Sequence, residues 1–104
     1  MTLVDGVIRA LDDPTRRALL DDLAHHGTAT ATSLSSHLPV SRQAVVQHLD
    51  VLTRAGLVRG ERHGRERRYV LRTEAILETA RWLDDLAATW ERRLESIKEI
   101  AEFP

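Results

Sequence analysis

Two short helical patterns joined by a tight turn stand in the middle of the chain and constrain its fold more than any other feature. Thr30 suits the N-cap of a helix over residues 31–38, because its hydroxyl can accept a bond from an exposed N–H group. Ser41 suits the same position before a second helix over 42–55, which Gly56 closes. Two short helices in this order are typical of the helix-turn-helix arrangement.

The sequence pattern changes from helical spacing to alternation directly after this pair of helices. The stretches "LVRGERH" and "RERRYVL" alternate enough to predict two strands, and His63-Gly64 lies near the tip between them. The sequence therefore predicts a β-hairpin over 57–71. A hairpin in this place is called a wing. We expect Tyr69 and Leu71 to pin it to the core.

Helical spacing of apolar residues accounts for most of the remaining chain. It predicts a helix over about 3–12, a second one that Asp13 caps and Pro14 begins, and a long one over about 74–101. The fold class is thus mainly α with a small β-hairpin, a winged helix-turn-helix with long terminal helices. We expect residues 1–104 to form one domain with its core over about 14–72.

Charge is sorted along the chain although the net charge is only −1. Residues 1–40 carry a net charge of −2 and residues 73–104 a net charge of −4. Residues 41–72 hold eight arginines against three carboxylates, a net charge of +5. A basic segment inside an acidic chain can neutralise phosphates while the remainder limits non-specific association.

The helix over 42–55 and the basic wing together predict an interface for double-stranded DNA. Polar residues at the N-terminal end of such a helix reach base edges in the major groove, and arginines of a wing reach phosphates or the minor groove. The alternative is a solvated face, which leaves Gln43 and Gln47 without base contacts. The candidate DNA-binding residues are Thr30, Thr32, Ser41, Arg42, Gln43, Val46, Gln47, Arg62, His63, Arg65, Arg67 and Arg68. His48 is expected to pack and hydrogen-bond inside.

The last helix is longer than a body of this size needs, so we expect it to join two copies of the chain. Trp82 and Trp90 could instead line an effector pocket, although packing at a dimer seam is the better account. The alternative function is a protein-interaction module that uses the last helix without specific DNA recognition. The candidate dimer-interface residues are Val4, Val7, Ile8, Leu11, Leu83, Trp90, Leu94 and Ile97.

Several function classes find no support in the residues. The chain has no cysteine, and its five histidines form no good ligand set: His25-His26 suit a frayed helix end and His37 a helix boundary. We expect no metal, no cofactor and no catalytic residues. An improvised metal site across a dimer stays open. No apolar run suits a membrane span, and the start of the chain lacks signal-peptide features, so we expect a cytoplasmic protein.

The stretches "LDDPTRRALLDDLA", "SRQAVVQHLDVLTRAGLV" and "RHGRERRYVL" resemble the ArsR-type winged helix-turn-helix transcriptional repressors of bacteria. The resemblance covers residues 3–101 and implies a homodimer, paired through its first and last helices, that binds an inverted repeat and blocks transcription. The tail with two tryptophans is similar to a metal-independent branch, in which repression of the protein's own operon is common. Where metal-sensing members carry a thiolate pair, this chain reads "TATSLSSHL", and no effector is indicated.

Overall fold

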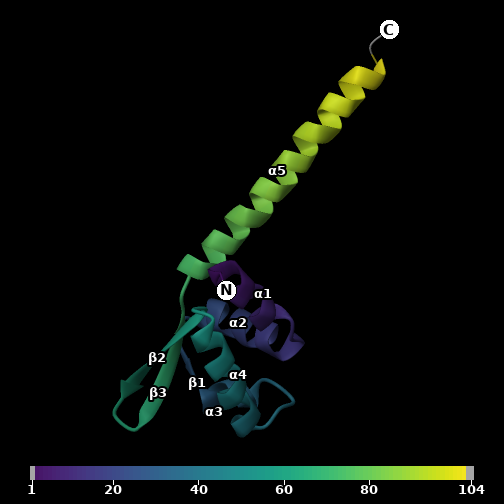
Figure 1. Cartoon of the computed structure of the whole chain (residues 1–104). Coiled ribbons are helices and arrows are strands. Elements are labelled where there is room, and N and C mark those ends of the chain that lie inside the picture. The colour runs from purple at the N-terminus through teal and green to yellow at the C-terminus, as the bar shows by residue number, and fades with distance from the viewer. Residues whose placement is uncertain (1, 103–104) are drawn as a thin grey trace.

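Short helices pack beside a small sheet, and a long helix projects from them, as Figure 1 shows. The computed structural model describes residues 2–102. Their elements, in chain order, are α1 (Leu3–Leu11), α2 (Pro14–His26), β1 (Ala29–Thr30), α3 (Ala31–Ser36), α4 (Arg42–Arg54), β2 (Val58–His63), β3 (Glu66–Leu71) and α5 (Glu74–Glu102). The predicted mainly α fold with a small β-hairpin, a winged helix-turn-helix, is confirmed.

The predicted helix starts are confirmed by their hydrogen bonds. The Asp13 carboxylate accepts from the backbone N–H groups of Thr15, at 2.8 Å, and of Arg16, at 3.1 Å. These bonds, that to Arg16 first, hold the pKa of Asp13 below its usual value. Thr30 caps α3, and Ser41 caps α4 by accepting from the backbone N–H of Ala44 at 3.1 Å. Each helix start is thereby fixed by one local side chain.

The sheet contains one strand more than the sequence predicts. β2 and β3 form the expected antiparallel hairpin, whose turn places Gly64 at φ +64°. β1 adds to the free edge of β3, with Ala29 opposite Tyr69, so the strand order is β1-β3-β2. Because β1 leads directly into the N-cap of α3, the sheet holds the start of the helix-turn-helix against the wing.

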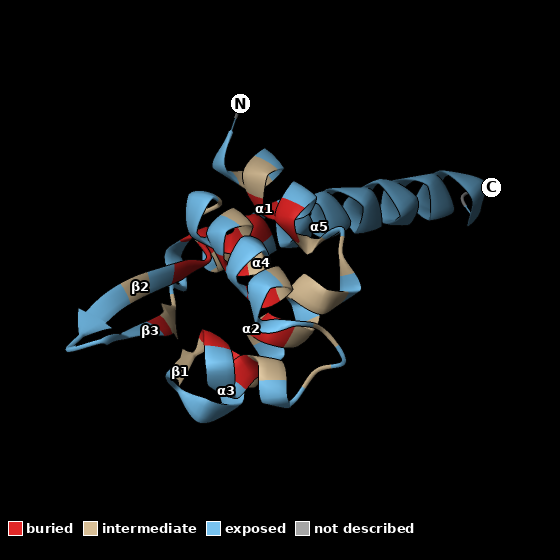
Figure 2. Cartoon of the chain, turned by 90° about the horizontal axis from the view of Figure 1, so that it is seen from below, coloured by how far each residue is buried: buried red, intermediate tan, exposed pale blue. Residues whose placement is uncertain are grey.

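The core lies where the inner faces of α1 to α4 meet the sheet, and Figure 2 shows this buried centre. Tyr69 is only 8% exposed, so it pins β3 to the core as expected, while Leu71 packs against the core's edge. The largest fully buried side chains are Leu19, Leu23, Leu34, Leu49, Leu52, Leu57, Val7, Val45 and Val58.

Two boundaries and one interface residue differ from the sequence prediction. α3 ends at Ser36 instead of Leu38, because a residue that precedes a proline, here Pro39, is disfavoured in helical conformation. α4 ends at Arg54, and Ala55 caps it. Val7, predicted at a dimer interface, is 1% exposed and packs in the core of its own chain. That part of the prediction is wrong, since a second copy could not reach this side chain.

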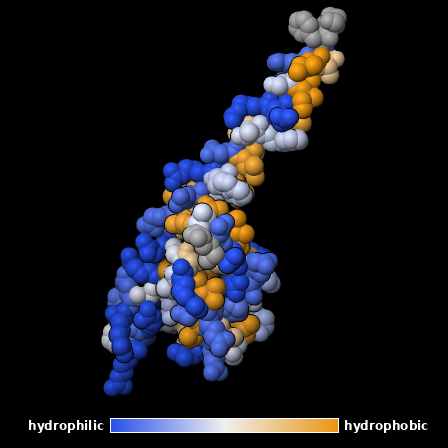
Figure 3. Space-filling view, viewed as in Figure 1, coloured by the Kyte–Doolittle hydropathy of each residue, from blue (hydrophilic) through white to orange (hydrophobic). Residues whose placement is uncertain are grey.

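α5 extends far beyond the rest of the chain (Figure 1). Its 29 residues span about 44 Å at ~1.5 Å per residue, and the molecule measures 72 × 25 × 24 Å. Its buried residues, Ala75 and Thr79, both lie in the first turns, beside α1. Beyond them α5 is solvent-exposed, with apolar side chains along the projecting rod (Figure 3).

Candidate nucleic-acid interface

α4 divides its side chains between the core and solvent. Val45, Leu49 and Leu52 form the buried stripe predicted from their spacing. The predicted contact residues at the other side are all exposed, including Val46 at 38%. The exposed face of α4 is therefore polar except for the two methyl groups of Val46. The exposed residues of this face, here called the outer face of α4, are Arg42, Gln43, Val46 and Gln47.

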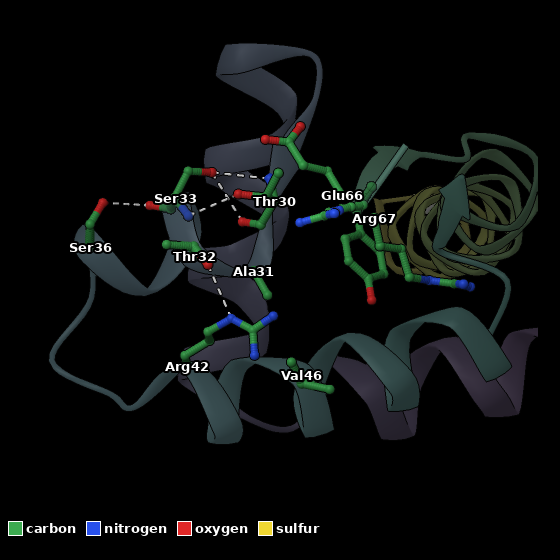
Figure 4. Close-up of a pocket in the computed structure, with 11 residues that line it drawn as sticks. Thr30, Ala31, Thr32, Ser33, Ser36, Arg42, Val46, Glu66 and Arg67 are labelled. Carbon is green, nitrogen blue, oxygen red and sulfur yellow. Dashed lines mark hydrogen bonds between the residues drawn. The ribbon is translucent and has the colours of Figure 1, made fainter. Parts of the chain in front are cut away.

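A side-chain hydrogen bond joins the two helices of the helix-turn-helix at their exposed ends. The Arg42 guanidinium donates from Nε to the hydroxyl of Thr32 at 3.0 Å (Figure 4). Both residues were predicted as contact residues, and the structure brings them together. Because Nε is used in this bond, the terminal nitrogens of Arg42 are oriented by α3 rather than by solvent.

Thr30 caps α3, as the sequence predicts, and its hydrogen bonding with Ser33 is reciprocal. Its hydroxyl accepts from the backbone N–H of Ser33 at 3.1 Å, and its own N–H donates to the Ser33 hydroxyl at 3.1 Å. This reciprocal pair is a capping box. Thr30, one of the predicted DNA-binding residues, thus takes part in the cap, and it is half-exposed.

Three elements converge on one groove of about 670 Å³. α3 forms one wall, α4 another, and the start of β3 with the preceding wing turn a third (Figure 4). The groove brings together candidate contact residues that lie up to 37 positions apart in the chain. Its lining includes six of the predicted contact residues, Thr30, Thr32, Arg42, Val46, Arg65 and Arg67.

The wing carries its charges on two different faces. Arg62 and Arg67 lie opposite each other and share a face with Tyr69, because side chains alternate along a strand. On the other face, Arg68 lies 3.2 Å from the Glu66 carboxylate, and His63 lies 3.5 Å from that of Glu61. Within residues 2–102, no carboxylate is within salt-bridge distance of Arg62, Arg65 or Arg67. The predicted set thus separates into three uncompensated arginines and two side chains that face carboxylates.

The sequence did not predict a polar cluster that Asp22 and His26 of α2 form with His37, which follows the end of α3. The His26 Nδ1 lies 2.6 Å from the Asp22 carboxylate, and the His37 Nδ1 lies 2.9 Å from its other oxygen. The two imidazoles stack, with ring centres 5.8 Å apart. The i, i+4 spacing of Asp22 and His26 was a readable signal, but nothing local connects either one to His37. His25, by contrast, bonds only within α2, to the Asp21 carbonyl at 2.7 Å.

This cluster shifts the pKa values of two groups. The hydrogen bond from His37 is the main cause that lowers the pKa of the Asp22 carboxyl below its usual 3.8. The backbone carbonyl of Asp22, followed by its carboxylate, raises the pKa of His26 above the usual 6.5. The expected frayed end of α2 is therefore wrong, since the helix continues to His26, whose ring stacks on His37, while Asp22 of α2 holds His37 at the end of α3.

His48 lies half-buried on α4, and its charge contributes to the lowered pKa of Asp13. Its half-buried position agrees with the packing expected of it, while the expected internal hydrogen bond stays a prediction. Between Thr2 and Glu102, the structure contains no group of three or more histidine, aspartate or glutamate side chains placed to hold a metal ion. No helix in the same range combines the length and apolarity that crossing a bilayer demands.

The remaining predicted interface residues are accessible to different degrees. Ile8 is 46% exposed on α1, whereas Val4 and Leu11 are half-buried there. The four candidates on α5 are all open to solvent, namely Leu83, Trp90, Leu94 and Ile97.

Comparison with known proteins points to one family. A helix-turn-helix domain model matches residues 11–61. The HTH-type transcriptional regulator Rv2034 of Mycobacterium tuberculosis is 39% identical over 98 residues, which are 94% of this chain and 88% of the relative. The transcriptional repressor SdpR of Bacillus subtilis is 31% identical over 80 residues, 77% of this chain and 88% of the relative. A solved ArsR-like transcriptional regulator from Rhodococcus sp. RHA1 superposes with a TM-score of 0.85 at 42% identity, over 98% of this chain and 95% of that one.

The chain belongs to the ArsR family of winged helix-turn-helix transcriptional regulators. It is a DNA-binding regulator rather than an enzyme, in agreement with the expectation from its sequence.

Proposed function

We propose that the protein is a homodimeric repressor that binds an inverted-repeat operator, with the DNA upstream of its own operon as the first candidate. One observation carries the proposal: the outer face of α4 and two wing arginines, Arg65 and Arg67, line neighbouring grooves, away from the apolar rod of α5. Such a molecule can hold DNA at one end and a second copy at the other.

α4 is the proposed recognition helix. The major groove of B-DNA admits an α-helix, and its base edges differ in hydrogen-bond pattern. Arg42 can donate two bonds to guanine and Gln47 can bond adenine, while the methyl groups of Val46 suit thymine. Ser41 and Gln43 lie at the same end of the helix, where the phosphate backbone passes. Each good bidentate pair contributes ~1–3 kcal/mol of discrimination.

The wing supplies the proposed phosphate contacts. Arg65 lies beside the wing turn, and Arg62 and Arg67 lie on the face that they share with Tyr69. These three arginines are the primary candidates, because they face no carboxylate of their own. We assign His63 and Arg68 a secondary role, since Glu61 and Glu66 already offset their charge. Thr32 joins them through the Arg42 bond, and Thr30 acts mainly through the cap of α3.

The proposed dimer uses an apolar seam on α5. Apolar residues recur at alternating steps of four and three positions, which is the spacing of a coiled-coil seam, and the large ones from Leu83 onward are exposed. The opposite side of the helix is charged, at Asp85, Arg92 and Glu99. Exposed Ile8 and the half-buried Val4 and Leu11 of α1 are expected to add to this surface. The seam residues are Ile76, Ala80, Leu83, Ala87, Trp90, Leu94, Ile97 and Ala101.

Repression is the proposed outcome, because a dimer that occupies promoter DNA blocks polymerase access. The relative SdpR is named a transcriptional repressor, which supports this choice over activation. The proposed repressor is metal-independent, since the chain has no cysteine with which to build a thiolate sensor. The cytoplasm is the compartment that this function requires.

A mobility-shift titration tests the proposal. The probe is the duplex upstream of the protein's own gene, and the control is a scrambled duplex of equal length and composition. We expect tighter binding to the upstream duplex by at least ~10³-fold at physiological salt. Equal affinity for both duplexes would remove sequence-specific repression. Sedimentation of the free protein tests the alternative function. A monomer would favour a protein-interaction module that uses α5 to bind another partner.

A further inference from the structure

Gly60 occupies the middle of β2, where a glycine is not required by the backbone. The glycines with positive φ are Gly27, Gly56 and Gly64, so Gly60 has a conformation that other residues adopt freely. A glycine inside a strand weakens the strand and often marks a place where another group approaches closely. The reason for a glycine at position 60 should therefore lie in the group that packs against this face of β2.

The guanidinium of Arg67 fills the space that a side chain at position 60 would take. A Cβ atom on Gly60 would lie 2.6 Å from Nε, 2.9 Å from Nη2 and 3.0 Å from Cζ of Arg67. The register explains this approach: Gly60 pairs with Tyr69 and Arg62 with Arg67, so Arg67 is the diagonal neighbour of Gly60 on one face.

Tyr69 gives the same guanidinium a platform. The Cζ atom of Arg67 lies over the tyrosine ring, 5.8 Å from its centre, within the range of a cation–π contact. Tyr69 is 8% exposed, so its ring is fixed by the core. The Arg67 side chain therefore lies across the wing rather than extending into solvent. It occupies the space that a side chain on Gly60 would take and lies over the fixed ring of Tyr69.

The held guanidinium lies where the wing faces α4. Arg67 lines the groove of about 670 Å³ together with Arg42 and Val46. It also lines a second groove, of about 350 Å³, whose other wall is α4 at Val46 and Gln47. A phosphate at the edge of a major groove occupied by α4 would pass this place. Glu66 and Asp50 line the same grooves, but no carboxylate within residues 2–102 lies at salt-bridge distance from Arg67.

We propose that Gly60 is a positioning residue for DNA binding: its missing side chain lets Arg67 lie across the wing against Tyr69, aimed at a backbone phosphate beside α4. This inference rests on the proposed function. It assigns to Gly60 an effect on affinity that passes entirely through Arg67, although Gly60 itself carries no group that could bind DNA.

The test is a double-mutant cycle of Gly60→Ala and Arg67→Ala, measured by fluorescence anisotropy on the labelled upstream duplex and its scrambled control over a series of salt concentrations. Arg67→Ala should weaken binding to both duplexes about tenfold and lower the salt slope by about one. Gly60→Ala should act in the same direction with a smaller loss. In the Arg67→Ala background, Gly60→Ala should have no further effect.

Two controls keep the cycle interpretable. Thermal unfolding of Gly60→Ala should be at or above the wild-type midpoint, because only a flexible side-chain end has to move. Arg59→Ala removes an arginine that pairs with Glu61 at 2.7 Å on the opposite face of the same strand, and should keep the wild-type slope.

The proposal is overturned if Gly60→Ala keeps wild-type affinity and salt slope while Arg67→Ala loses them. It is equally overturned if Gly60→Ala weakens binding as much without Arg67 as with it. Failure of the wild-type protein to bind either duplex would instead contradict the proposed function itself, so the two failures are distinguishable.

Discussion

At the scale of single residues, the interface depends on which side of an element each charged or polar group occupies. Arg42 donates to Thr32 and so arrives at the groove already oriented by α3. Gln47 lies on the same helix face and makes no side-chain hydrogen bond within residues 2–102, which leaves both its donor and its acceptor for a base. Arg65 lies beside Gly64 in the wing turn, from which an arginine can reach phosphates or the minor groove.

Gln47→Ala should change the base preference of the protein more than its general affinity for DNA. The amide can bond an adenine edge in bidentate fashion, and its loss should cost ~1–3 kcal/mol of discrimination at one base pair of each half-site. Selection from a randomised duplex pool measures this preference directly. An unchanged preference at every position would exclude Gln47 from base recognition.

Arg65→Ala should weaken binding to all sequences alike. A wing arginine that neutralises one phosphate releases counterions without regard to sequence, so its loss should lower the salt slope by about one. Titrations on the upstream and scrambled duplexes at several salt concentrations provide the measurement. A loss confined to the upstream duplex would show that Arg65 recognises bases instead.

The caps and the buried stripe of α4 were predictable from sequence, because both depend on residues within one or two helical turns. Thr30, Ser41 and Leu49 illustrate this. The division of the wing arginines was not predictable, because a one-residue change of register would exchange the two faces. The role of Gly60 depends on the same register, since only the pairing with β3 places Arg67 above it.

At the scale of elements, α3 is held from both sides. The capping box and β1 fix its start, while His37, just after its end, bonds Asp22 of α2. β1 escaped sequence prediction because two residues are too few to show an alternation, and the strand exists only through its pairing with Tyr69 and Arg68. The contact between His26 and His37 joins residues eleven positions apart across two elements, which no local pattern records.

The pH dependence of stability should follow this cross-link. Because the pKa of His26 is raised, its contribution is fully present below 6.5 and declines as pH rises through the folded-state value. Because the pKa of Asp22 is lowered, its contribution is present above 3.8 and is lost as pH falls through its folded-state value. The cluster should therefore stabilise the fold most between 3.8 and 6.5.

Chemical unfolding of the wild type and His26→Gln at pH values on either side of 6.5 provides the measurement. The difference in the free energy of unfolding should grow as pH falls through the raised folded-state pKa of His26 toward 6.5, and should keep its full value just below 6.5. His25→Gln is the matched control, because His25 bonds only within its own helix. A pH-independent difference between the wild type and His26→Gln would contradict the account.

At the scale of the whole molecule, the length of α5 is the feature that one copy leaves unexplained. Large apolar residues along the rod are about half exposed, as in Leu83 at 52% and Ile97 at 50%. Contiguous exposed apolar surface of this kind marks an interaction site. The spacing of apolar residues predicted α5 and its apolar stripe. It could not predict what covers the stripe, because that depends on a second molecule.

Leu94→Glu should convert the proposed dimer into a monomer and greatly weaken operator binding. The substitution places a charge in the seam, where a second copy would have to bury it without a partner. Ser96→Glu introduces the same group two residues further along, off the seam, and should leave the dimer intact. Sedimentation velocity measures both variants. A Leu94→Glu protein that sediments as the wild type does would remove α5 from the interface.

The most direct test of the central claim, that two copies present paired α4 helices to one duplex, is a hydroxyl-radical footprint of the protein on the DNA upstream of its own gene. The account predicts two protected half-sites, arranged as an inverted repeat, with centres about one helical turn, ~10 base pairs, or a whole multiple of it apart. Protection of a single half-site, or of two half-sites in the same orientation, would contradict it.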